Sequence, residues 1–273
     1  NDLITKWELN STLYEDYFSN NSNDLIESYC VMCSLLGNDF IPHLLTLNLK
    51  NNGLDDLLLY TKNSIKLYDL LIINGNINHK CLTEIFNRLS INEDTTLYKI
   101  TETYINKKVY NSKLQSDFYA IKHKDSIAID IYNDFKNWKY IYYNNKFNTN
   151  IYLDSSVISQ ACENYIKGIY WTYYYYKYNI IDHEWFYPYN FPPIIKDIAN
   201  HSVGNHPPNI TNNGSFISND IQLLIVLPKN SNKLLKNSIK KYTEDINLGL
   251  YHMFPIKYNI HTFLKNHLLF FFH

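Results

Sequence analysis

Residues 35–43 read Leu-Leu-Gly-Asn-Asp-Phe-Ile-Pro-His, and this stretch governs the interpretation of the whole chain. An apolar run typical of a helix stops at Gly37, a carboxylate follows at Asp39, and Pro42 starts a new segment. Glycine permits a tight turn or a close backbone approach, and proline is favoured where a segment begins. We therefore expect Asp39 at the rim of a packed element, within reach of a hard cation. The alternative is an aspartate that only caps a helix or forms a turn.

The length and composition are those of a globular protein. The 273 residues can form one large domain or two small ones, and 45% of them are hydrophobic. The net charge is −1, so no overall field attracts nucleic acid, and any such attraction must come from local lysines. Five lysines gather near the end at mostly helical spacing, where we expect a solvated helix face: Lys229, Lys233, Lys236, Lys240 and Lys241.

The cysteines and the apolar segments bear on the compartment. Cys30 and Cys33 have the spacing of half a zinc site, but no second pair follows, so we expect buried thiols in a helix. We see no signal peptide and expect a reducing compartment, the cytoplasm, with the nucleus left open. No apolar stretch approaches the ~18 residues that span a bilayer, so we expect a protein with no membrane partner.

The spacing of apolar residues predicts a mainly helical chain. Residues 74–76 predict a turn, residues 200–214 a loop rich in Asn, Gly and Pro, and residues 221–227 the opening of a final unit that runs to His273. The expected helices cover residues 25–36, 54–68, 80–89, 133–143, 156–178 and 193–198.

Several blocks, in order, resemble one known family. Residues 37–43 resemble the Gly-Asn-Asp-Phe-Leu-Pro-His signature of the Xrn-type 5′→3′ exoribonucleases, and the Leu-Leu-Gly-x-Asp pattern also resembles the related flap endonucleases. Further blocks that resemble family segments are residues 75–78, 138–147, 165–176, 185–193 and 222–228. The resemblance covers nearly the whole chain, as the C-terminal part of a conserved catalytic region that starts just before residue 37.

The resemblance implies a fold and a division of the chain. The fold would be a mainly α lobe that completes an α/β PIN/flap-nuclease-like core, whose N-terminal part is absent from this chain. Residues 1–60 would be the end of that core, and residues 61–273 a helical region that wraps the active site. The upstream core segment of the same protein is thus an expected partner.

The resemblance also implies the chemistry. Such enzymes hold divalent ions, Mg²⁺ or Mn²⁺, with clustered carboxylates and hydrolyse 5′-monophosphorylated single-stranded RNA to mononucleotides. Asp39 matches the catalytic, metal-binding aspartate of the family motif. The other family carboxylates lie upstream, so we expect this chain alone to be inactive. His43 also falls in the motif, but we expect it to bond backbone. Four other acidic residues could substitute for the missing ligands, and a capping role at a helix start explains the last two: Asp24, Glu27, Asp55 and Asp56.

Six aromatic residues crowd into residues 170–176. Aromatic rings can stack on the bases of single-stranded RNA irrespective of sequence. The alternative, which we favour for most of these rings, is packing between helices. The family places one aromatic stack beside the substrate, and Trp171 and Trp185 are both candidates for it.

The chain also departs from the family pattern. Residues 177–185 replace an Arg-Gly turn and one tryptophan, Asn190 and Pro192 replace a common histidine and alanine, and the family's late segment after Met253 is not clearly retained. These departures leave open a second hypothesis, a degenerate relative that binds RNA or acts as a scaffold without catalysis. A third, a DNA-directed flap-type nuclease, fits the aromatic blocks less well.

Overall fold

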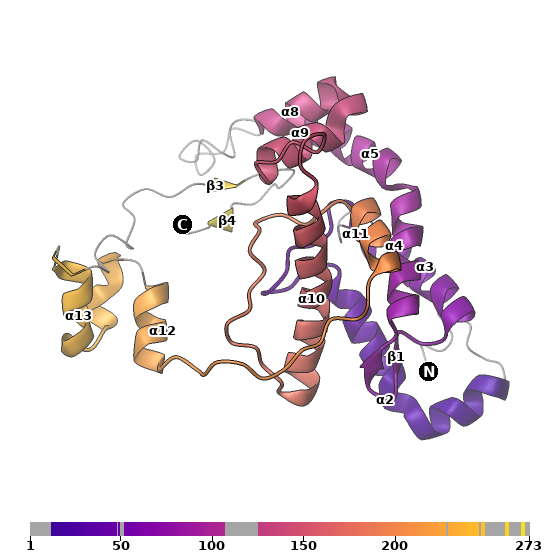
Figure 1. Ribbon diagram of the computed structural model, residues 1–273, viewed down its shortest axis with the longest axis horizontal. Coiled ribbons are helices and arrows are strands. Elements are labelled where there is room, and N and C mark those ends of the chain that lie inside the picture. Colours follow the sequence, from indigo (N-terminus) through magenta and orange to yellow (C-terminus); the bar gives the residue numbers. More distant parts are fainter. Residues whose placement is uncertain are drawn as a thin grey trace. The chain divides into compact units, whose positions relative to one another are not determined.

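The computed structural model describes residues 12–47, 49, 52–106, 125–227, 229–245, 247–248, 260–261 and 269–270. The chain divides into two compact units (Figure 1). Unit 1 comprises Asn1–Lys107 and Ser126–Asn213, and unit 2 comprises Lys108–Asp125 and Gly214–His273. The expected division after residue 60 concerns sequence regions and stays a prediction; residues on both sides of it share the core of unit 1.

Unit 1 is a helical unit with one small hairpin. Strands β1 (Ile72–Ile73) and β2 (Asn76–Ile77) pair antiparallel around the predicted turn, with Ile72 opposite Ile77. The helices are α2 (Thr12–Ser34), α3 (Gly53–Tyr68), α4 (His79–Ile91), α5 (Glu93–Asn106), α8 (Ser126–Asn133), η2 (Phe135–Asn137), α9 (Trp138–Lys146), α10 (Ser156–Tyr178) and α11 (Ile195–Gly204).

The long helix α10 runs through unit 1 and contributes many of its buried residues (Figure 1). It packs against α11 and α2, while α4 packs against both α11 and α3. One continuous apolar core joins these helices and includes Met32, Leu57, Phe86, Ile169 and Ile198, each completely or almost completely buried. Burial of apolar surface from segments far apart in sequence holds the helices in this arrangement.

The mainly α prediction is confirmed, and the helices expected at residues 54–68, 80–89 and 156–178 are found near those bounds. Helix α2 begins earlier than expected and α11 ends later, while the single helix expected at residues 133–143 is divided among α8, η2 and α9. The helix predicted at residues 156–178 has those limits. The loop predicted at residues 200–214 is wrong in its first part, because α11 continues to Gly204. Its polar residue Ser202 is buried and bonded to α4, so tertiary contacts outweigh the local loop signal.

The prediction of buried thiols is wrong for Cys30. Its side chain is exposed, Cys33 is half-buried, and Cys81 and Cys162 are buried; all four thiols are free. The buried side of α2 carries Leu25, Val31 and Met32, so Cys30 lies on the opposite side of the helix.

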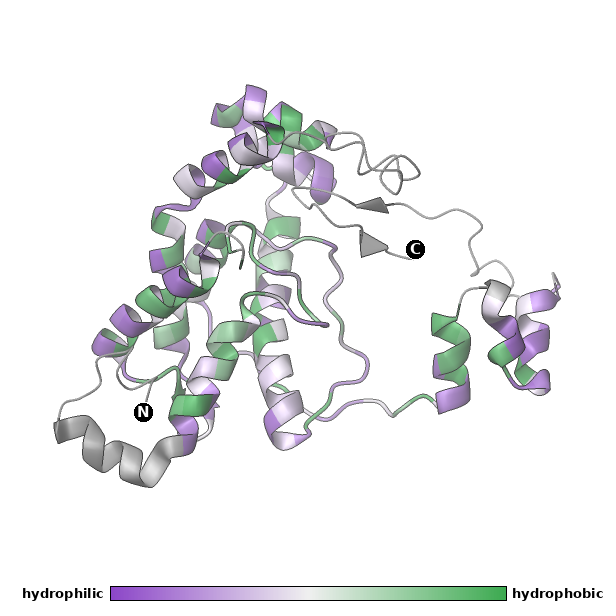
Figure 2. Cartoon of the chain, turned by 180° about the vertical axis from the view of Figure 1, so that it is seen from behind, coloured by the Kyte–Doolittle hydropathy of each residue, from purple (hydrophilic) through white to green (hydrophobic). Residues whose placement is uncertain are grey.

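Unit 2 contains short helices and a second small hairpin. Its elements are α12 (Asn219–Val226), η3 (Lys229–Leu234), α13 (Asn237–Glu244), β3 (Ile260–His261) and β4 (Leu269–Phe270). Helix α12 is strongly hydrophobic beyond its first turn, whereas α13 is mixed (Figure 2).

The expected lysine-bearing helix face is divided between two elements, η3 and α13. Lys236 directly precedes α13 and pairs with Asp220 at 2.6 Å, while Lys240 pairs with Glu244 at 3.5 Å. These two cations are partly neutralised within unit 2. The stretch that follows Met253, where the family pattern is lost, lies outside the described residues apart from the two-residue strands β3 and β4.

Among the described residues, none of the helices has both the length and the run of apolar residues needed to cross a membrane.

Candidate functional site

The turn at residues 37–43 is built by its own sequence. Gly37 has φ +96°, and a Cβ there would lie 2.9 Å from both the Cβ and the backbone N of His43, so the predicted need for glycine is confirmed. The Asn38 Oδ1 accepts hydrogen bonds from the backbone N–H of Phe40 at 2.8 Å and of Ile41 at 3.0 Å. This Asx-type arrangement closes the turn around Asp39.

Helix α10 holds the far side of this turn. The Tyr165 hydroxyl donates to the Pro42 carbonyl at 2.9 Å, and the Ile41 side chain lies directly against the helix at Gly168. The Phe40 and Trp171 rings make a T-shaped contact at a centroid distance of 4.7 Å and a 63° interplanar angle. Three successive residues of the turn are therefore each fixed by α10.

Asp39 itself is exposed at the surface, next to this anchored segment. Its position agrees with the expected carboxylate at the rim of a packed element. Within the described part of the chain, no three His, Cys, Asp or Glu side chains gather closely enough to hold a metal ion. The residues described here therefore do not form a complete Mg²⁺ site, which needs several oxygen ligands.

The acidic residues that could replace the missing metal ligands have structural roles. Asp24 is buried and accepts the backbone N–H groups of Asn74 at 2.7 Å and Gly75 at 3.3 Å, so it closes the β1–β2 turn. Asp55 and Asp56 lie in the first turn of α3, where the helix dipole favours negative charge.

Glu27 joins α2 to the end of α10. It accepts a hydrogen bond from the Tyr173 hydroxyl at 2.7 Å and forms an ion pair with Lys177. Burial and the bond to Glu27 raise the pKa of Tyr173, and the same carboxylate raises the pKa of Lys177. Glu27 is thus committed to this contact.

His43 behaves as expected for a turn residue. Its Nδ1 lies 2.9 Å from the Leu44 carbonyl, so the ring bonds the backbone. Because this bond occupies the Nδ1–H, the ring is held in place within the turn.

The two stacking candidates lie in one aromatic cluster beside the turn. Trp171 is 6% exposed, and Tyr175 stacks on it with a centroid distance of 5.2 Å and an interplanar angle of 8°. The Trp171 Nε1–H donates to the Asp182 carbonyl at 3.0 Å. Trp185 is half-buried, 5.5 Å from Trp171, and donates to Asn164 Oδ1 at 3.3 Å. Trp185 therefore offers more open ring surface than Trp171, and both stay candidates.

The crowded aromatic residues 170–176 divide as expected between packing and exposure. Tyr170 and Tyr173 are buried together with Trp171, whereas Tyr176 is 68% exposed and lies 6.2 Å from the Phe40 ring. Most of these rings therefore pack in the core, and the exposed one neighbours the turn.

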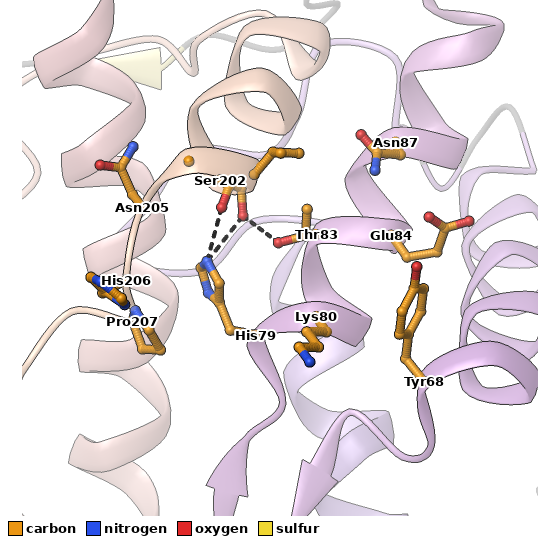
Figure 3. Close-up of a pocket in the computed structure, with 12 residues that line it drawn as sticks. Tyr68, His79, Lys80, Thr83, Glu84, Asn87, Ser202, Asn205, His206 and Pro207 are labelled. Carbon is orange, nitrogen blue, oxygen red and sulfur yellow. Dashed lines mark hydrogen bonds between the residues drawn. The ribbon is translucent and has the colours of Figure 1, made fainter.

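A separate pocket of about 670 Å³ opens between α4 and the end of α11 (Figure 3). His79 Nε2 lies 3.2 Å from the Ser202 carbonyl, and its Nδ1 lies 3.1 Å from the Tyr170 hydroxyl. Thr83 Oγ1 lies 2.6 Å from the Ser202 hydroxyl. Burial lowers the pKa of His79, which favours the neutral ring. These polar groups bond one another and join the two helices, so we assign them a structural role.

Sequence reasoning assigned no role to Tyr165 and Gly168, although both fall within the block at residues 165–176 that resembles the family. A glycine inside a strongly helical pattern is a signal of close packing, and here it marks the point where the turn meets α10.

Comparison with known proteins identifies a matching family. The sequence model of the Xrn1 helical domain matches residues 19–134 and 131–265. The chain is 36% identical over 75 residues to 5′-3′ exoribonuclease 2 of Debaryomyces hansenii, which covers 27% of this chain and 8% of that protein. It is 24% identical over 226 residues to human 5′-3′ exoribonuclease 1, which covers 66% of this chain and 13% of that protein.

A third relative is 5′-3′ exoribonuclease 1 of Saccharomyces cerevisiae, 28% identical over 113 residues, which covers 40% of this chain and 7% of the yeast protein. The chain thus spans about a tenth of the length of the curated relatives that it matches.

Proposed function

The chain belongs to the Xrn1 helical domain family, and from this premise we propose that it is part of a 5′→3′ exoribonuclease. Its substrate would be single-stranded RNA with a 5′-monophosphate, hydrolysed to mononucleotides in the presence of Mg²⁺ or Mn²⁺. The observation that carries the proposal is the turn at residues 37–43, which presents an exposed Asp39 and is anchored on α10. The relatives named as exoribonucleases support it.

In this proposal Asp39 is the one carboxylate that the described residues contribute to the metal site. The remaining ligands would come from an upstream nuclease-core segment of the same protein, which is also the main expected partner of this helical lobe. Cytoplasmic RNA decay is the proposed setting, with nuclear RNA processing as the alternative. Cell fractionation with an antibody to this chain would decide between the two compartments.

The test is Asp39→Ala in the full-length protein, assayed with 5′-phosphorylated RNA and Mg²⁺. We expect mononucleotide release to be abolished while the fold is retained, because the side chain is exposed and a lost ligand disables the metal site. Asp56→Ala is a matched control, since this exposed carboxylate lies at the start of α3 and should leave turnover unchanged. Cleavage at the wild-type rate by the Asp39 variant would refute its role.

A second candidate is a non-catalytic relative that binds RNA or acts as a scaffold. The loss of a tryptophan within residues 177–185 and the absence of an acidic cluster among the described residues favour it. Full-length protein that binds 5′-phosphorylated RNA but releases no nucleotide with either Mg²⁺ or Mn²⁺ would support this candidate. Faster cleavage of DNA ends than RNA ends would instead point to a flap-type nuclease.

A further inference from the structure

One side of α10 contacts the turn at residues 37–43 residue by residue. Tyr165 bonds the Pro42 carbonyl, Gly168 faces Ile41, and Trp171 meets Phe40. Positions three apart on a helix lie on the same side, so these contacts form a continuous row. The turn therefore runs along α10 in the reverse direction, and the next residue in line is Asp39.

The contact at Gly168 is the closest of this row. A Cβ at residue 168 would lie well inside van der Waals contact with Ile41 Cγ2 and 3.0 Å from Trp185 Cη2. Ile41 is 2% exposed, and its Cγ2 is fixed directly to the branched Cβ. This methyl group moves only by rotation about χ1, which its buried surroundings oppose, so we expect a side chain at residue 168 to shift the turn relative to α10.

We propose that Gly168 is a positioning residue for Asp39. Its missing side chain lets Ile41 seat against α10, and this seating fixes where the adjacent segment presents the Asp39 carboxylate. The inference rests on the proposed function of Asp39 as a metal ligand. Helix α10 would then contribute to metal binding by positioning Asp39, without supplying a ligand of its own.

The test is Gly168→Ala in the full-length protein, with Mg²⁺ binding measured directly by calorimetry without RNA and turnover of 5′-phosphorylated RNA measured across a Mg²⁺ titration. We expect the Mg²⁺ concentration for half-maximal rate to rise by about 10-fold or more, as for other residues that orient a metal ligand. The KM for RNA should stay near the wild-type value, because the helix still packs in the same core. Gly204→Ala is the matched control, since a Cβ at residue 204 meets nothing within 4 Å.

A rescue variant separates positioning from general destabilisation. Ile41→Ala removes the Cγ2 that meets residue 168, whereas Ile41→Val keeps both branches at Cβ. In the Gly168→Ala background we therefore expect Ile41→Ala to restore part of the Mg²⁺ affinity and Ile41→Val to restore none. Equal effects of the two substitutions would overturn the inference.

A folded Gly168→Ala variant with the wild-type Mg²⁺ dependence would also overturn it. If circular dichroism shows that this variant does not fold, Tyr165→Phe decides, because it removes only the hydroxyl that bonds Pro42. We then expect a smaller shift in the same direction, and no shift would refute the inference. Failure of the proposed function is distinguishable, because wild type and Asp39→Ala would then not differ in turnover.

Discussion

Trp171, a candidate for stacking on RNA, is largely buried by contacts with neighbouring side chains. Its ring is stacked by Tyr175, makes a T-shaped contact with Phe40 and is flanked by Trp185, and its N–H is bonded to the Asp182 carbonyl. A base can stack only on a free ring face. Loss of RNA binding in a Trp171 variant must therefore be interpreted together with its stability.

Trp171→Ala should lower the free energy of unfolding by about 3–5 kcal/mol, the usual cost of deleting a buried tryptophan. Tyr176→Ala is the control on the same helix, because that side chain is 68% exposed and its loss should change stability by less than ~0.5 kcal/mol. Urea unfolding of the two variants and the wild type measures both values. Similar midpoints for Trp171→Ala and the wild type would show that the indole is not a packing residue.

At this residue level the sequence predicted the turn but not its support. Gly37, Asp39 and Pro42 lie close together in the sequence, so a local pattern was enough to predict the turn. Tyr165 and Gly168 lie more than 120 residues away, and nothing in a single sequence pairs them with Pro42 and Ile41. Such contacts depend on how helices pack.

Helix α11 is held by a carboxylate from another helix. Glu93, at the start of α5, is 1% exposed and accepts the backbone N–H groups of Ile195 at 2.8 Å and Lys196 at 3.0 Å. Tyr143 adds a second tie, since its hydroxyl donates to Asp197 at 2.6 Å and accepts from the Ile194 N–H at 3.0 Å. Side chains from α5 and α9 thus accept the backbone N–H groups of Ile194, Ile195 and Lys196 at the start of α11.

This cap should make stability depend on pH. Burial raises the pKa of Glu93 from 4.5 to about 7, although the two amide donors and Lys139 lower it. The native chain then binds this proton more tightly than the unfolded chain, so the contribution is full below pH 4.5 and is lost as pH rises through 7. The shift corresponds to about 3 kcal/mol.

We expect the wild type to lose about this amount of stability relative to Glu93→Gln between pH 4.5 and 8. Denaturant unfolding of both proteins across that range measures the difference. A carbon-13 titration of the Glu93 carboxyl gives an independent midpoint, expected near 7. Parallel stability curves, or a midpoint near 4.5, would contradict the prediction.

Elements with strong periodicity were predictable and those with weak periodicity were not. Helix α10 has apolar or aromatic residues at three- and four-residue steps along its length, and its limits were found. Helices α5 and α8 were not expected, because α5 is largely polar and α8 has only eight residues. Their helical state depends on packing instead, since α5 contacts α8 and α8 also contacts α9.

The whole chain combines a well-packed helical unit with one exposed candidate ligand. Hydrolysis assisted by two metal ions needs several carboxylates around the same point. The described residues bring no such group together, and the net charge of −1 gives no general attraction for RNA.

The isolated 273-residue chain, incubated with 5′-phosphorylated RNA and Mg²⁺, should therefore release no mononucleotides above background. Thin-layer separation of labelled products checks this directly, with Asp39→Ala as the control for contaminating nuclease. Release that disappears in that variant would mean that this chain carries a complete metal site of its own.

The hydrogen bond between Tyr165 and Pro42 also has a consequence for folding during synthesis. The two residues are separated by 123 positions, so the support for the turn is synthesised long after the turn itself. At roughly 5–20 residues per second, the delay is about 6–25 s. Throughout this interval Ile41 has no partner from α10, and its apolar side chain is open on that side to chaperones or to neighbouring nascent chains. Premature termination before residue 165 would leave that surface permanently uncovered by α10, and such products should be found in the aggregated fraction of the cell.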